Sequence, residues 1–344
     1  MVTKRKTSSK SKKSTKKTLL EVQNLSTHFS TRAGLIKAVN DVSFTLDAGE
    51  VLAIVGESGC GKSVSALSIM GLIPNPPGKI VNGKILFEGN DLVKAPPGKL
   101  QGIRGEQISM IFQEPMTSLN PVMTIGSQIS ESLILHKNLS KKEAWNRAGE
   151  LLLQVGIPDA LEKMNDYPHQ MSGGQRQRVM IAIAMSCDPK LLIADEATTA
   201  LDVTVQAQIL ELLMKVTQES KTALIIITHN LGIVARYADR VNVMYAGKII
   251  ETGTAMDVYK KPGHPYTQGL LGSVPNLLNT GSKRLTTIEG EIPDLSNLPK
   301  GCSFAPRCPS PTEEGKKGNI EMKLIEVSKG HWVDQCGMKC GQNN

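Results

Sequence analysis

One octapeptide constrains the fold more than any other feature of the chain: Gly56-Glu57-Ser58-Gly59-Cys60-Gly61-Lys62-Ser63, which fits Gly-x-x-x-x-Gly-Lys-Ser. The apolar run 51–55 precedes it and the helical pattern 64–73 follows it, so it occupies a strand-to-helix turn. Its three glycines let backbone N–H groups and the helix N-terminus point at a phosphate. Lys62 adds a cation, and Ser63 adds a hydroxyl ligand for Mg²⁺. We therefore predict a nucleoside triphosphate site; the alternative is a glycine-rich turn that matches by chance.

Composition is that of a soluble globular protein. The chain has 344 residues, enough for two domains, and 40% of them are hydrophobic. No apolar stretch reaches the ~18 residues of a membrane span, and the first residues lack the apolar segment of a secretory signal. The six cysteines are not expected to form a disulfide framework.

The positive charge is concentrated at the N-terminus. Eight of the 40 basic residues lie before Thr18 with no acidic residue among them, so the other 32 balance the 32 acidic residues. We expect residues 1–17 to be a disordered basic tail, because such a segment cannot bury apolar surface. The tail is either a solvated leader or a segment that touches anionic lipid or RNA.

The rest of the chain predicts an α/β fold with an ATPase domain over 18–262 and a C-terminal region over 263–344. Buried apolar runs such as Leu191-Leu192-Ile193 indicate parallel strands covered on both faces. Between 115 and 188 the pattern is mostly helical, which predicts a helical insertion. Strands are expected at 19–22, 42–46, 51–55, 83–87, 108–112, 191–194, 224–228 and 241–245, and helices at 64–73, 125–136, 141–155 and 175–187.

Two carboxylates end the apolar strand at 191–194. Asp195 is predicted to hold Mg²⁺ through its water shell, and Glu196 to orient and deprotonate an attacking water. A strand that ends in Asp-Glu is weak evidence alone. About 130 residues after a phosphate-binding loop it becomes strong evidence for triphosphate hydrolysis.

A second anion site follows at Met171-Ser172-Gly173-Gly174-Gln175, where Ser172 is placed as the N-cap of a helix and two glycines expose backbone N–H groups. This segment resembles the signature motif of ATP-binding cassette (ABC) ATPases, except that Met171 stands where Leu is usual. The resemblance implies a RecA-like P-loop core with an antiparallel β subdomain and a helical subdomain. It also implies that the signature of one cassette closes on ATP held by the P-loop of its partner.

Further residues extend the resemblance in the family's order. Gln113 is similar to the Q-loop glutamine, Asp202 belongs to a segment, Thr199-Ala200-Leu201-Asp202, that resembles the D-loop, and His229 resembles the switch histidine. Phe29 is similar to the aromatic residue that stacks on adenine; without the resemblance it would be read as core, and His229 as a structural histidine. The catalytic set implied is Glu196, His229, Gln113 and Lys62. The ATP-binding set implied is Phe29, Gly56, Ser58, Gly59, Cys60, Gly61, Lys62, Ser63, Val64, Ser172, Gly173, Gly174, Gln175 and Asp202, with Ser63, Gln113 and Asp195 at Mg²⁺.

Longer segments narrow the resemblance to the dipeptide, oligopeptide and nickel branch of ABC importers. They are the phosphate-binding loop, residues 110–121 and 167–174, and in the C-terminal region residues 264–267 and 301–308. The resemblance implies a peripheral protein at the cytoplasmic face of the cell membrane. It implies as partners a paralogous ATPase in a heterodimer, two transmembrane permease subunits and an extracytoplasmic peptide-binding protein, with no specific nucleic acid.

Four cysteines gather near the C-terminus: Cys302, Cys308, Cys336 and Cys340. Four thiolates can hold a [4Fe–4S] cluster or Zn²⁺, and the alternative is separate reduced thiols. The resemblance favours iron–sulfur, although Gly315 stands at the place of the family's third cysteine. Cys340 is then required to replace that ligand.

The function implied is an ATPase that drives uptake of dipeptides or oligopeptides across the cytoplasmic membrane. The alternatives are an ABC ATPase that acts on nucleic acid or ribosomes, an importer for nickel or another small solute, and a protein that binds ATP without hydrolysing it. A single cassette without a coiled-coil insertion disfavours the first, and the presence of Lys62, Asp195, Glu196 and His229 disfavours the last.

Overall fold

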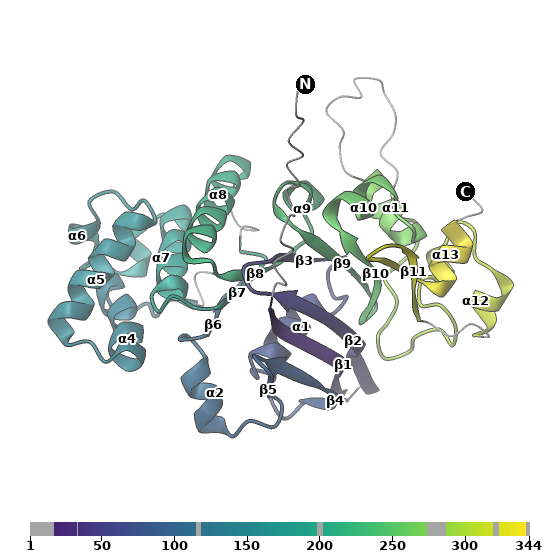
Figure 1. Ribbon diagram of the computed structural model, residues 1–344, viewed down its shortest axis with the longest axis horizontal. Helices are drawn as coiled ribbons and strands as arrows, with labels where there is room; N and C mark the ends of the chain where they lie inside the picture. The colour runs from purple at the N-terminus through teal and green to yellow at the C-terminus, as the bar shows by residue number, and fades with distance from the viewer. Residues whose placement is uncertain are drawn as a thin grey trace, which may run out of the picture.

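A computed structural model describes residues 17–32, 34–114, 118–197, 202–273, 287–318 and 323–341 (Figure 1). The predicted basic tail lies outside the described residues except for Lys17. The same holds for residues 199–201 of the predicted D-loop and for residues 115–117, which follow Gln113.

A mixed sheet forms the centre of the molecule. Within the described residues it has eight strands in the order β11-β12-β10-β9-β3-β8-β7-β6, parallel from β9 to β6 and antiparallel from β9 to β11. Every residue of β3, β7 and β8 is buried, as expected for strands covered on both faces. The bounds are β3 Val51–Val55, β6 Ile108–Ile111, β7 Leu191–Asp195, β8 Ala223–Thr228, β9 Arg240–Tyr245, β10 Lys248–Thr254, β11 Leu324–Ser328 and β12 His331–Asp334.

A smaller antiparallel sheet packs over α1 (Lys62–Ile69), in the order β2-β1-β4-β5. Its bounds are β1 Thr18–Thr31, β2 Gly34–Asp47, β4 Gly78–Phe87 and β5 Asn90–Asp91. The side chains it buries share one apolar core with α1 and with one face of the central sheet. This arrangement is the antiparallel β subdomain that the family resemblance implied.

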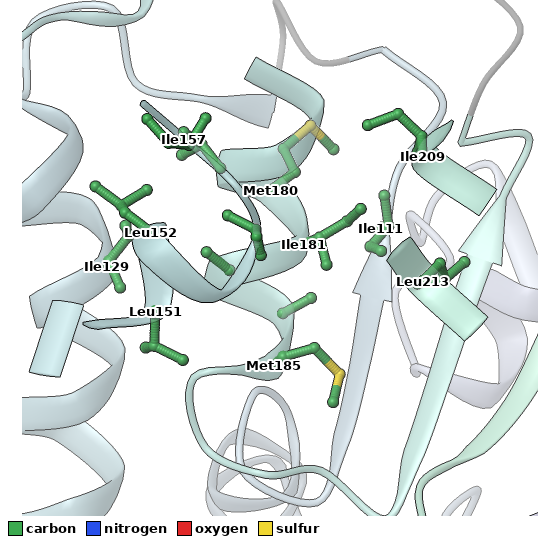
Figure 2. Packing of buried hydrophobic residues seen from close by; sticks show 14 of the residues in the cluster. Ile111, Ile129, Leu151, Leu152, Ile157, Met180, Ile181, Met185, Ile209 and Leu213 are labelled. Atoms are coloured by element: carbon green, nitrogen blue, oxygen red, sulfur yellow. The ribbon is translucent and has the colours of Figure 1, made fainter. Parts of the chain in front are cut away.

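Helices α4 to α7 form a separate lobe beside the other face of the sheet (Figure 1). Figure 2 shows Ile181 of α7, Ile111 of β6 and Leu213 of α8 in one apolar core. The bounds are α2 Pro97–Ile103, α4 Ile125–Lys137, α5 Lys141–Gln154, α6 Ala160–Lys163, η1 Pro168–Gln170, α7 Gly173–Met185, α8 Val203–Ser220 and α9 Leu231–Tyr237. No helix in the described ranges is both long enough and apolar enough to cross a bilayer.

The C-terminal region continues the central sheet. β12 pairs with β10 through Glu251↔Val333, and Tyr266 and Phe304 pack against Tyr245 of β9, with ring centroids 4.6 and 5.3 Å from that of Tyr245. The region therefore shares a core with the end of the cassette. α10 Ala255–Lys260 precedes this region, whose other elements are α11 Pro265–Gly272, η2 Ala305–Arg307, α12 Glu313–Lys317 and α13 Gln335–Gly341.

Several expected element ends were wrong. The strands predicted at 19–22, 42–46 and 83–87 extend further in the structure: β1 continues to Thr31, β2 begins at Gly34 and β4 begins at Gly78. The helix predicted over 64–73 ends at Ile69, because Gly71 adopts φ +62° and turns the chain out of the helix. The strand predicted over 108–112 ends at Ile111, and the side chain of Phe112 is exposed.

Candidate active site

The phosphate-binding loop connects β3 to α1 and runs close to other backbone. A Cβ on Gly56 would lie 2.3 Å from the carbonyl oxygen of Met244, and a Cβ on Gly61 would lie 2.3 Å from that of Ala38. Gly56 and Gly61 also have φ of +153° and +105°. Only glycine fits these two positions, so sterics dictate the spacing of the motif.

Lys62 is buried at the base of this loop. Its Nζ donates to the carbonyl oxygens of Gly56 at 2.8 Å and of Glu57 at 2.9 Å. These bonds satisfy the buried ammonium group of Lys62. To reach a phosphate, the group would have to break them. Cys60 is buried beside it, and burial raises the pKa of the Cys60 thiol.

Ser63 of α1 and Asp195 at the end of β7 are in direct contact. The Ser63 hydroxyl donates to Asp195 Oδ1 at 3.0 Å. Asp195 is 6% exposed, and burial raises the pKa of its carboxyl despite the bond from Ser63. A hydroxyl and a buried carboxylate are the oxygen donors that Mg²⁺ prefers, so this pair fits the predicted Mg²⁺ position.

Glu196 follows and has contacts from three sides. Gln113 Nε2 donates to its Oε2 at 3.0 Å, while Lys62 Nζ and His229 Nδ1 lie 4.0 and 3.7 Å from its Oε1. Glu196 adopts φ +45°, a left-handed conformation that costs energy for a residue with a side chain. The structure therefore brings the four predicted catalytic residues together, with Gln113, Lys62 and His229 around the carboxylate of Glu196. Because Gln113 contacts Glu196, its place among the Mg²⁺ ligands stays a prediction.

The predicted signature lies apart from this cluster, at the start of α7 in the helical lobe (Figure 1). Ser172 is the N-cap: its hydroxyl accepts from Gln175 N, and Gln175 Oε1 accepts from Ser172 N at 2.9 Å. Gly173 and Gly174 form the first turn, and Ser172 is exposed. Asp202 caps α8 by accepting from the backbone N–H groups of residues 204 and 205. The role of this motif opposite a partner's nucleotide stays a prediction.

Phe29 is half-buried in β1 and lies against Gly78 of β4. A Cβ on Gly78 would lie 2.7 Å from the Phe29 ring. This packing serves the small sheet, so the adenine-stacking role also stays a prediction. Ser58 and Val64 occupy the loop and the first turn of α1, as the sequence predicted.

Sequence reasoning missed one set of contacts with the loop. Glu57 is held by Arg307 and Tyr266, both from the C-terminal region. Tyr266 lies in the segment 264–267 and Arg307 in the segment 301–308. The only available signal was that these segments extended the resemblance.

The four C-terminal cysteines line one small cavity together with Gly315 and His264. A Cβ on Gly315 would lie 2.6 Å from Cys336 Sγ, so this glycine stands at the cavity wall, as does Cys340. Burial raises the pKa of Cys308 to about 11 and also raises that of Cys340, and the Cys302 thiol together with burial raises that of Cys336. Nevertheless, no three His, Cys, Asp or Glu side chains among the described residues are arranged to hold a metal ion. The structure does not support the predicted [4Fe–4S] cluster as a preformed site.

Comparison with known proteins gives consistent matches. A family model described as ABC transporter matches residues 39–199, and one described as the C-terminal region of oligopeptide/dipeptide transporters matches residues 250–314. The dipeptide transport ATP-binding protein DppD of Bacillus subtilis is 55% identical over a region that covers 85% of this chain and 87% of the DppD chain. The oligopeptide transport ATP-binding protein OppD of the same organism is 56% identical over 92% and 87%. A solved dimeric ATP-binding cassette in a post-hydrolysis state, bound to ADP and phosphate, has a TM-score of 0.62 and 26% identity over 69% of this chain and 99% of that one.

Proposed function

Because this chain belongs to the ABC transporter family of oligopeptide and dipeptide ATP-binding proteins, we propose that it is the ATP-hydrolysing subunit of an importer for dipeptides or oligopeptides. One observation carries the ATPase assignment: Ser63 contacts Asp195 while Gln113, Lys62 and His229 surround Glu196. The match at residues 250–314 carries the peptide assignment. It favours peptides over nickel and disfavours a role on nucleic acid.

Each residue of the site has a separate proposed role in ATP hydrolysis. Bound Mg²⁺ would be held by Ser63 and Asp195 and would offset phosphate charge. Lys62 turns from the Gly56 and Glu57 carbonyls to the β- and γ-phosphates. Glu196 accepts the proton of the attacking water and is oriented by the amide of Gln113.

Closure on ATP is proposed to require a second cassette. Ser172 is exposed at a helix N-terminus, where backbone N–H groups and the helix dipole favour an anion. The solved relative with bound ADP and phosphate is a dimer, which supports the same arrangement here. We propose a paralogous ATPase as the partner, in a heterodimer.

The proposed membrane partners dock on the helical side of the cassette. A groove beside β6 and α7 is lined largely by apolar side chains, among them Met110, Phe112, Leu119 and Ile183. Phe112 directly precedes Gln113, so a permease helix in this groove would reach the residue that contacts Glu196. Two permease subunits and an extracytoplasmic peptide-binding protein complete the proposed complex at the cytoplasmic face of the membrane.

The cysteine-lined cavity supports a secondary proposal, that Cys302, Cys308, Cys336 and Cys340 form one ligand set for a metal centre. The thiols would have to lose their protons and turn toward a common point on binding. Such a centre would be structural or redox-regulatory, because the catalytic residues lie elsewhere.

Purification of the tagged chain from detergent-solubilised membranes tests the main proposal. We expect two membrane-spanning permeases and a second ATPase to co-purify, and ATP turnover in liposomes to rise when a peptide-loaded binding protein is added. Recovery of ribosomes or nucleic acid in place of permeases would contradict it. Stimulation by nickel but not by peptides would move the assignment to the metal branch.

A further inference from the structure

The C-terminal region contacts the phosphate-binding loop through a forked ion pair. Arg307 Nη1 donates to Glu57 Oε2 at 2.6 Å, and Nη2 donates to Oε1 at 3.0 Å. The Arg307 side chain is 4% exposed and that of Glu57 is 24% exposed. Paired, partly buried geometry of this kind is stronger and more directional than a surface ion pair.

Arg307 is itself fixed in place. Its Nε donates to the carbonyl oxygen of Glu289 at 3.1 Å, and its guanidinium lies 5.9 Å from the centroid of the Tyr245 ring. Since η2 places Arg307 and the segment 287–290 anchors it, the arginine presents a rigid fork to Glu57.

The backbone of Glu57 is held as well. Its N–H donates to the Tyr266 hydroxyl at 2.8 Å. Tyr266 is fully buried and packs on Tyr245 and Phe304, so its hydroxyl has little freedom to move. Both the side chain and the main chain of Glu57 therefore bond to residues that lie after the cassette.

We propose that the C-terminal region is a working part of the nucleotide site, in which Arg307 and Tyr266 are positioning residues that hold the phosphate-binding loop through Glu57. The inference rests on the proposed ATPase function. Lys62 now bonds to the Gly56 and Glu57 carbonyls and must release them to reach a phosphate. The contacts from Arg307 and Tyr266 hold Glu57 in place during that exchange.

Charge gives a second reason for the pair. The Glu57 carboxylate belongs to the loop that binds a triphosphate, and unpaired it would repel that anion. Arg307 neutralises it at close range. Loss of Arg307 therefore removes a tether and exposes a repulsive charge, whereas loss of both side chains removes only the tether.

Binding of MgATP to the full chain, measured by titration calorimetry, tests the proposal. Arg307→Ala is expected to weaken binding by about tenfold or more. Arg307→Lys, which keeps the charge but cannot fork, and Tyr266→Phe should each weaken it by a few-fold. Arg147→Ala, which breaks the exposed Arg147–Glu150 pair on α5, is the matched control and should bind as the wild type does.

The double variant separates the two contributions. Glu57→Gln combined with Arg307→Ala should bind MgATP more tightly than Arg307→Ala alone, because the repulsive charge is gone. In the assembled transporter the KM for ATP should rise in Arg307→Lys while kcat stays within about twofold, since Glu196 and His229 are untouched. A purely structural role would lower thermal stability in all variants without this split.

Wild-type affinity in Arg307→Lys and Tyr266→Phe, together with MgATP binding by the double variant no tighter than by Arg307→Ala, would overturn the inference. These two variants carry the test if Arg307→Ala does not fold. Failure of the wild type to bind MgATP, or equal binding by Lys62→Ala, would instead reject the proposed function.

Discussion

At the scale of single residues, Glu196 makes the most specific prediction. Glu196→Gln keeps the shape of the side chain but removes the base, so hydrolysis should fall by roughly 10²–10⁴-fold while MgATP still binds. Single-turnover phosphate release and nucleotide titration check the two halves. Normal turnover by this variant in the assembled complex would remove Glu196 from its proposed role.

Asp195 is expected to lower the stability of the nucleotide-free chain although hydrolysis requires it. Its folded pKa lies above the unfolded value of 3.8 because burial penalises the charge. The folded state therefore holds the proton more tightly, and stability falls as pH rises from the unfolded pKa through the folded one. At pH 7 Asp195→Asn should raise the melting midpoint of the nucleotide-free chain by a few degrees and reduce Mg²⁺-dependent hydrolysis about 10²-fold or more.

Asp294→Asn is the matched control for that measurement. Asp294 is exposed, and the hydrogen bonds it accepts from Ser296 lower its pKa. The pKa shift is therefore opposite in sign to that of Asp195, and ionised Asp294 favours the folded state. Its replacement should not raise the midpoint. An increase of equal size in both variants would mean that removal of any negative charge, and not relief of a buried one, explains the Asp195 result.

At the scale of elements, the N-terminus of α7 is expected to act on the partner's nucleotide. Ser172→Arg places a long cation at an exposed N-cap, away from this chain's own Lys62 and Glu196. Nucleotide binding by the isolated subunit should stay within about twofold, whereas turnover at the shared site should be lost. Full-rate hydrolysis by monomers shown not to dimerise would contradict the two-cassette mechanism.

The segments around the cysteine cavity give a prediction about metal. If the four thiols are one ligand set, anaerobically purified protein should contain iron and sulfide at about four each per chain, and Cys340→Ser should lower both. Iron, sulfide and zinc analysis measures this. Protein without iron or zinc would leave four separate reduced thiols, which agrees with the raised pKa values of Cys308 and Cys340.

The sequence predicted some elements well because their own residues specify them. β3, β7 and β8 are apolar runs buried on both faces, and their observed bounds differ from the prediction by at most one residue. β10 was not predicted from the sequence, because this strand contains a buried acidic residue, Glu251. That carboxylate is satisfied by the N–H groups of Gly263 and His264 and by His331 Nε2, all from later in the chain. Local periodicity cannot indicate a strand whose buried polar residue is hydrogen-bonded only by residues distant in the sequence.

The same distinction holds in the active site. Ser63, Asp195 and Glu196 were predicted because each lies at or beside the end of a strand or helix, within a motif whose spacing indicates triphosphate binding and hydrolysis. Arg307 lies 250 residues from Glu57 along the chain. No periodicity, cap or turn rule connects them, so only the packed fold reveals the pair.

At the scale of the whole molecule, the C-terminal region predicted over 263–344 shares a sheet and an apolar core with the cassette. β11 and β12 extend the central sheet beyond β10, and the third apolar core contains Val243 and Tyr245 of the cassette beside Tyr266 and Phe304. The boundary at residue 262 therefore runs through one sheet and one core.

A chain truncated after Pro262 tests the consequence. It would leave β10 as an open edge, bury Glu251 without His331, and expose the apolar side of β9. We expect poor solubility and a melting midpoint lower by about 10 °C or more, with weakened MgATP binding in whatever monomer remains. A deletion of residues 1–16, which removes charge but no described contact, is the control and should melt as the full chain does. If the truncated cassette stayed monomeric and melted within a few degrees of the full chain, the C-terminal region would be an independent domain, and the continuity of sheet and core would contribute little to stability.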